Sequence, residues 1–249
     1  MIKKVARKFL EGKKCVFCGN YGLYRLKDKS IRCKKCRRQY SIKKLRKDIN
    51  ILHYFCLEIS ASKTAKQLDL SYNTVHNKFT FFRRKIAEHS DMNFRKISGE
   101  LELDETYFGG TRKGKRGRGA YNKAIIFGIL ERDGKVYVKV VPDVKAETLM
   151  AEIKTKTEKG SVFYTDCFKS YKSLKRYGKH CRINKEHAFA VGRNHINGIE
   201  SFWAFAKERF HKYHGINREN YPLYLKEMEF RFNNRNEDIF NLMFNIIYT

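Results

Sequence analysis

Four of the seven cysteines form two pairs whose spacing suits a metal site. Cys15 and Cys18 make one Cys-x2-Cys pair, Cys33 and Cys36 make the other, and fourteen residues separate the pairs. Two such pairs can supply four thiolates to one tetrahedral Zn²⁺ ion. The spacing therefore predicts a structural zinc site. Two disulfides or four unrelated thiols are the alternatives, and disulfides fit poorly with a chain that shows no export signal.

The segment between the pairs has the length of a hairpin, and Gly19 directly after the first pair suits a tight turn. A module of about 40 residues has too small a core to fold alone, so metal binding would stabilise the fold itself. We therefore expect a zinc ribbon over residues 1–42. Cations and tyrosines alternate in it, which suits contacts with phosphates and bases, and Arg37 and Arg38 are the candidates.

Three acidic residues that lie far apart in the sequence form a second candidate site. Asp104 lies in a segment of strand-like alternation, Asp166 ends a short apolar segment, and Glu200 lies near the start of a long helical segment. Lys207 follows Glu200 by two helical turns, so both project from about one helix face. Carboxylates are the ligands that a hard cation such as Mg²⁺ prefers. These residues could hold such an ion if the fold brings them together.

The segments that carry these residues predict an α/β domain over residues 96–249. Strands are expected at 100–108, 124–131, 135–141, 161–167 and 181–183, and helices at 145–159, 169–177 and 197–212. Asp133-Gly134 between two apolar runs is the strongest hairpin signal. The order β-β-β-α-β-α-β-α is that of an RNase H-like fold, and the three carboxylates fall where that fold places metal ligands.

A net charge of +28 favours a polyanionic partner, and nucleic acid is the commonest one. Residues 1–50 alone contribute +15 of this charge. A glycine-rich basic segment, 109–123, follows Asp104, and we expect it to grip DNA through Arg112, Lys113, Lys115, Arg116 and Arg118. An anionic membrane surface is the less favoured partner. The longest apolar run, Ala124–Leu130, is far short of the ~20 residues that cross a bilayer.

Residues 43–95 predict a small helical module. Apolar residues at helical spacing indicate a helix over 43–59, and Ser62 and Ser71 are expected to cap two more, at 63–70 and 72–89. A short helix, a brief turn and a second helix are typical of helix-turn-helix DNA readers. A plain three-helix bundle shows the same pattern and stays the alternative. The residues expected to contact DNA are Asn73, Thr74, His76 and Lys78.

Four motifs in order carry a resemblance to a known family. They are LELDETYFGG (101–110), FYTDCFKSY (163–171), HINGIESFWAFAKERFHKYHGI (195–216) and EFRFNNR (229–235). With them the chain resembles insertion-sequence transposases of the DDE class, in the subgroup with an N-terminal zinc ribbon. The resemblance implies that Asp104, Asp166 and Glu200 are the catalytic triad and that Lys207 is the basic residue behind the glutamate. Two other residues could be the first carboxylate of the triad in place of Asp104. They are Glu105, on the opposite face of the strand, and Glu102, earlier on the same face.

The resemblance also implies the reaction, the ions and the partners. The triad would hold two catalytic Mg²⁺ ions, with Mn²⁺ fitting the same ligands, beside the structural Zn²⁺. Water would cut at the element's end, and the freed 3′-OH would then attack target DNA, with no covalent protein–DNA intermediate. The partners would be double-stranded DNA at transposon ends and target, and a second copy of the chain in a homodimer or larger assembly.

Two other functions compete with this interpretation. A zinc-ribbon and helix-turn-helix regulator would explain the charge and the cysteines and would leave the ordered acidic residues unexplained. A non-transposing RNase H-like nuclease, such as a junction resolvase, would leave the end-recognition modules without purpose. The basic N-terminal segment lacks a secretory signal. We therefore expect a cytoplasmic protein of a prokaryote that associates with the nucleoid and does not bind a membrane.

Overall fold

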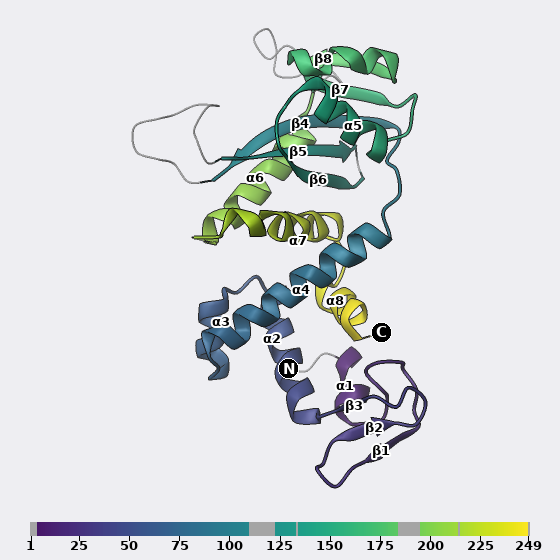
Figure 1. The fold of residues 1–249 in the computed structure, drawn as a ribbon, viewed down its shortest axis with the longest axis vertical. Coiled ribbons are helices and arrows are strands. Elements are labelled where there is room, and N and C mark those ends of the chain that lie inside the picture. Colours follow the sequence, from purple (N-terminus) through teal and green to yellow (C-terminus); the bar gives the residue numbers. More distant parts are fainter. Residues whose placement is uncertain (1–3, 110–122, 133, 184–194, 214, 249) are drawn as a thin grey trace. The chain divides into compact units, whose positions relative to one another are not determined.

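A computed structural model of the protein describes residues 4–109, 123–132, 134–183, 195–213 and 215–248 (Figure 1). The chain divides into two compact units: Met1–Asp91 together with Asn234–Thr249, and Met92–Asn233. The expected DNA-gripping cations, Arg112, Lys113, Lys115, Arg116 and Arg118, lie outside the described residues. No helix in the described parts of the chain combines the length and the apolar character needed to span a membrane.

The first unit begins with a small β module. A short helix, α1 (Lys4–Leu10), precedes a three-stranded antiparallel sheet of β1 (Leu23–Arg25), β2 (Ile31–Cys33) and β3 (Gln39–Tyr40). Its buried side chains are few, chiefly Val16, Ile31 and two of the cysteines. A core this small agrees with the expectation that a metal would stabilise the module.

Three helices follow: α2 (Ile42–Cys56), α3 (Ala61–Leu68) and α4 (Tyr72–Met92). Ser71 caps α4 as expected, because its Oγ accepts the Thr74 N–H. The prediction that Ser62 caps α3 is wrong. Ser60 has the extended backbone of a cap, and its side chain accepts the Lys63 N–H. Helix α3 therefore begins directly after Ser60, at Ala61, which is two residues before the predicted start at residue 63. The left-handed backbone of Asp69 ends α3, and three residues separate α3 from α4.

The last helix, α8 (Ile239–Tyr248), belongs to the first unit, whereas the sequence pattern predicts an α/β domain that extends to residue 249. Its buried Phe240, Met243 and Phe244 explain this placement. The ring of Phe244 lies 5.2 Å from that of Phe9 in α1. An apolar helix packs wherever a matching apolar surface is available, and here α1 and α2 supply that surface.

We expect Phe244→Ala to lower the free energy of unfolding of the first unit by about 3–5 kcal/mol, because it leaves a cavity against Phe9. Hydrogen exchange would show lost protection in α1 and α2 with unchanged protection in the second unit. Asn241→Ala, on the exposed side of the same helix, is the matched control and should have little effect. Equal protection in both variants would contradict the packing role of α8.

The second unit is built on a five-stranded sheet of order β6-β5-β4-β7-β8. Its strands are β4 (Glu100–Phe108), β5 (Ala124–Glu131), β6 (Val136–Val141), β7 (Val162–Asp166) and β8 (Lys179–Ile183). β5 runs antiparallel to β4 and β6, whereas β7 is parallel to β4 and β8 is parallel to β7. An antiparallel three-strand meander extended by two parallel strands in this order confirms the predicted RNase H-like fold.

Helices cover the two faces of this sheet (Figure 1). They are α5 (Ala146–Lys156), the 3₁₀ helix η1 (Lys169–Arg176), α6 (Asn197–Lys212) and α7 (Tyr221–Asn233). A further 3₁₀ helix, η2 (Arg218–Asn220), directly precedes α7. The helix predicted at 145–159 ends earlier, at Lys156, because Thr157 has an extended backbone and forms a β-bridge with Ile97. One apolar core joins α6 and α7 to the sheet, and a second joins α5 and η1 to the opposite face.

Candidate functional site: a cysteine cluster and a carboxylate-bearing sheet

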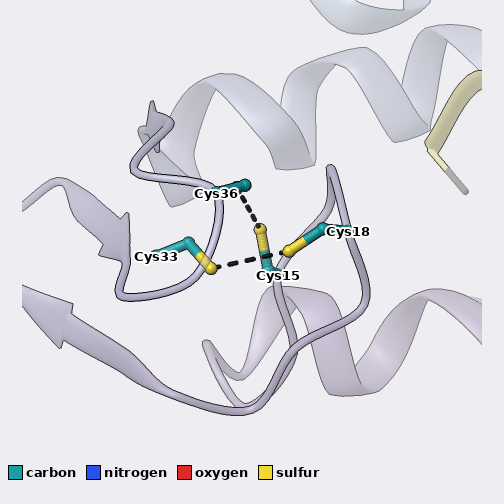
Figure 2. Close-up of side chains that lie close together, drawn as sticks. All are labelled: Cys15, Cys18, Cys33 and Cys36. Atoms are coloured by element: carbon teal, nitrogen blue, oxygen red, sulfur yellow. Dashed lines mark hydrogen bonds between the residues drawn. The ribbon is translucent and has the colours of Figure 1, made fainter.

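The four paired cysteines converge in space (Figure 2). The Cys15 and Cys36 sulfurs are 3.7 Å apart, those of Cys18 and Cys33 are 3.6 Å apart, and all four lie within 4.8 Å of one another. With Zn–S bonds of about 2.3 Å, the sulfurs of a tetrahedral site are about 3.8 Å apart. The separations therefore suit one tetrahedral metal ion, and they are too long for disulfide bonds of about 2.05 Å.

Both cysteine pairs use the same local turn. The N–H of Gly19 donates to the Cys15 carbonyl, and the N–H of Arg37 donates to the Cys33 carbonyl, each at 3.0 Å. Both Gly19 and Arg37 have positive φ, which Gly19 adopts at low cost and Arg37 does not. The first turn was predicted from the glycine. The second was not, because an arginine gives no such signal.

The turns give the thiols unequal environments. Burial raises the pKa of Cys15 to about 12. Hydrogen bonds from the backbone N–H groups of Cys36 and Lys35 lower the pKa of Cys33 to about 7. Amides directed at a sulfur favour the thiolate, which is the form that binds a metal.

Asp104 and Asp166 lie on neighbouring parallel strands. The register pairs Glu102 with Tyr164, so two residues further along Asp104 stands level with Asp166. Alternation places Asp166 on the same face as Tyr164, whose ring belongs to the core under α6. Both aspartates therefore face α6, at the point where the ladder between β4 and β7 has ended. Asp166 also accepts the Phe168 N–H at 2.9 Å, which orients its carboxylate.

Helix α6 carries Glu200 in its first turn, on an exposed position. Three residues later the buried Trp203 donates its indole N–H to Asp104 Oδ2 at 3.1 Å. This bond ties the first turns of α6 to the centre of β4. Lys207 is exposed on the same side of the helix as Glu200, two turns further on, as the sequence predicted.

Among the described residues, the four cysteines are the group of potential ligands whose atoms lie close enough together to hold an ion. Asp104 and Asp166 lie on the sheet face that α6 covers, and Glu200 lies in the first turn of α6. The oxygens of these three carboxylates are not as close together as the four cysteine sulfurs.

Glu102 is the residue whose role the sequence did not reveal. It is almost completely buried, and its oxygens accept the Ile199 N–H at 2.9 Å and the Arg132 Nε–H at 3.1 Å. Arg132 also donates to the His195 carbonyl and lies 3.6 Å over the ring of Tyr164. A carboxylate at a helix N-terminus satisfies a backbone N–H and suits the helix dipole. Glu102 therefore anchors the start of α6.

We expect Glu102→Leu to lower the free energy of unfolding of the second unit by about 3 kcal/mol, because it removes the carboxylate from a largely buried Arg132. Urea denaturation followed by tryptophan emission measures this, since Trp203 is the only tryptophan. Glu102→Gln keeps an acceptor for the Ile199 N–H and should lose less. If the two variants unfold at the same urea concentration as the unchanged protein, the anchoring role is wrong.

Glu105, the other rival to Asp104, lies on the opposite face of β4. Its carboxylate accepts the Tyr171 hydroxyl at 2.6 Å. Burial first, and the Glu105 charge second, raise the pKa of Tyr171 well above its usual value, with smaller contributions from Asp104 and Asp166. Glu105 is thus engaged in the core under α5 and η1, to which Tyr171 belongs.

The residues expected to contact DNA differ in their surroundings. Asn73 is exposed, and His76 is half-buried with its ring stacked on Tyr72. Thr74 is bonded to Ser71 in the cap of α4. Lys78 forms an ion pair of 2.7 Å with Asp48 and so links α4 to α2. In the β module, Arg37 and Arg38 are exposed, and Arg38 lies over the ring of Phe17.

Comparison with known proteins identifies a family and a relative to which this chain is similar. Residues 96–233 match the family described as ISXO2-like transposase domain. An uncharacterized transposase-like protein of Haemophilus influenzae is 48% identical over 101 residues, which cover 40% of this chain and 82% of that protein.

Solved structures with a similar arrangement are more distant. The catalytic core domain of BIV integrase is 15% identical, with a TM-score of 0.36, over 52% of this chain and 81% of that one. A chain of the Mos1 strand transfer complex is 11% identical, with a TM-score of 0.31, over 79% and 72% of the two chains. TM-scores this low add no support to the fold assignment, which rests on the strand order of the sheet.

Proposed function

The chain belongs to the family of ISXO2-like transposases, and on that premise we propose that it is a DNA transposase that cuts at the ends of a mobile element and joins the freed 3′-OH to target DNA. The observation that carries the proposal is the placement of the carboxylates. Asp104 and Asp166 lie level on adjacent parallel strands, and α6, which bears Glu200, covers their face.

Asp104, Asp166 and Glu200 form the proposed catalytic triad, and their oxygens suit a pair of Mg²⁺ ions, or Mn²⁺, by ligand type. Such ions, when bound, stabilise the attacking and leaving oxygens of a phosphodiester. The chain's own contribution is to hold the carboxylates in place. The Phe168 N–H orients Asp166, the Trp203 indole orients Asp104, and Glu102 anchors the helix that carries Glu200. Lys207, which is exposed on α6 two turns after Glu200, is the residue that we propose to contact a DNA phosphate.

The first unit is the proposed reader of the element's ends. The cysteine cluster would hold Zn²⁺, because four thiolates at tetrahedral separations match its preferred ligands. The three-residue turn between α3 and α4 has the length found in helix-turn-helix modules. Asn73 and His76 at the start of α4 are the proposed base-contacting residues. Arg37 and Arg38 would contact phosphates. Lys78 is not included among the proposed DNA-contacting residues, because it forms an ion pair with Asp48.

A labelled end sequence incubated with the protein and Mg²⁺ tests this function. Cleavage followed by joining to a second duplex supports a transposase. Cleavage without joining favours a nuclease, and binding without cleavage favours a regulator. No covalent protein–DNA adduct should form, since the scheme uses no protein nucleophile. Because two ends and a target must be held together, we propose that the active form is a homodimer or larger, which light scattering of the DNA complex would measure.

A further inference from the structure

Trp203 is placed to do more than fill the core. Only 4% of its surface is exposed, and its Nε1 donates to Asp104 Oδ2 across 99 residues of sequence. An indole N–H can only donate a hydrogen bond, and an ionised carboxylate can only accept one, so the two groups suit each other. The bond restricts the rotation of the Asp104 carboxylate. It also links that carboxylate to the helix whose first turn carries Glu200, three residues earlier.

Gly128 on β5 makes the approach of Trp203 possible. It is the residue directly opposite Asp104 in the β4–β5 ladder. A Cβ atom at this position would lie 2.6 Å and 2.8 Å from two ring carbons of Trp203, and 3.0 Å from Ile199 Cδ1. A glycine inside a strand weakens it, and it commonly marks a site of close approach. Here the indole occupies the space that a side chain would take, and so reaches Asp104.

We propose that Trp203 is a positioning residue for the divalent-cation site, which holds Asp104 in the orientation that binds the ion. This inference rests on the proposed function, because it assumes that Asp104 is a ligand. Hydrogen bonds to a metal-binding side chain fix its orientation and tune its affinity for the ion. Trp203 itself touches neither the ion nor the DNA, and it acts through Asp104.

The chain contains a built-in probe of this arrangement, since Trp203 is its only tryptophan. We would titrate the zinc-loaded protein with Mg²⁺ and with Mn²⁺ and record its tryptophan emission. The expected result is a saturable change with Mg²⁺, quenching with Mn²⁺, and neither effect in Asp104→Asn. If the emission is unchanged at ion concentrations that bind to the protein, Trp203 is not coupled to the site and the inference is overturned.

Three substitutions separate positioning from packing. Trp203→Phe keeps a ring and removes the N–H, and we expect Mn²⁺ affinity, measured from the free-ion EPR signal, to fall about 10- to 100-fold. Gly128→Ala keeps the tryptophan but displaces it, so its emission should respond weakly to ions. Tyr171→Phe is the matched control, because it removes one hydrogen bond to a carboxylate on the opposite face of β4. It should leave Mn²⁺ affinity unchanged.

The proposed function and the positioning role of Trp203 can be disproved separately. If the unchanged protein does not cleave end DNA, the proposed function fails, while Mn²⁺ binding and its dependence on Trp203 still test the positioning role. If cleavage occurs and Trp203→Phe binds Mn²⁺ as tightly as the unchanged protein, only the positioning role is wrong. Binding of end DNA should be equal in all folded variants. Should Trp203→Phe fail to fold, the emission titrations of the unchanged protein and of Gly128→Ala decide.

Discussion

Replacing Asp104 with asparagine is expected to reduce Mg²⁺-dependent cleavage of end DNA by roughly a thousand-fold or more, and to abolish joining. A bound ion stabilises charge in the transition state by several kcal/mol, and a neutral amide in place of a ligand carboxylate forfeits most of that effect. Asp166→Asn should do the same, because Asp166 stands level with Asp104 on the neighbouring strand. Cleavage and strand transfer of a labelled duplex measure both steps, and binding of end DNA should be unaffected.

Glu105→Gln is the matched control for this prediction. It removes the same charge from the adjacent residue, but that carboxylate faces the opposite side of the sheet and is bonded to Tyr171. We expect cleavage within a few-fold of the unchanged protein. If Glu105→Gln loses activity and Asp104→Asn keeps it, the face covered by α6 is not the catalytic one, and the assignment of the triad is wrong.

Replacing Cys33 with serine is expected to abolish the proposed binding of zinc and to unfold residues 12–40. The binding free energy of a structural zinc is about 10–16 kcal/mol in apparent terms and is coupled to folding, because the module has little core of its own. Elemental analysis would show loss of one zinc per chain, and hydrogen exchange would show loss of protection in β1–β3. Affinity for end DNA should fall with it.

Cys181→Ser is the control for the cysteine experiment, since it removes a thiol from the second unit. It should keep one zinc per chain and full binding of end DNA. Retention of zinc by Cys33→Ser would contradict the metal assignment. So would isolation of the unchanged protein with Cys15, Cys18, Cys33 and Cys36 joined as disulfides.

Much of this protein followed from local sequence. The bounds of β4, β5 and α6 agree with those expected, because alternation, helical periodicity and the Asp-Gly turn are properties of neighbouring residues. The cysteine cluster could be predicted for the same reason. Each Cys-x2-Cys pair is closed by its own backbone turn, so its geometry depends on a few consecutive residues. Asp104, Asp166 and Glu200 needed more, namely the RNase H-like fold that the predicted order of strands and helices indicated.

What the sequence could not decide depends on contacts between segments far apart in the chain. The apolar residues of α8 indicate that it is buried, but they fit any apolar surface, and only the tertiary structure assigns it to the first unit. Glu102 and Asp104 share one face of β4 and look alike in sequence. The folded chain places a helix N-terminus and an arginine against the first and an indole against the second. Such roles are set by which groups pack against a side chain, and a linear pattern does not contain that information.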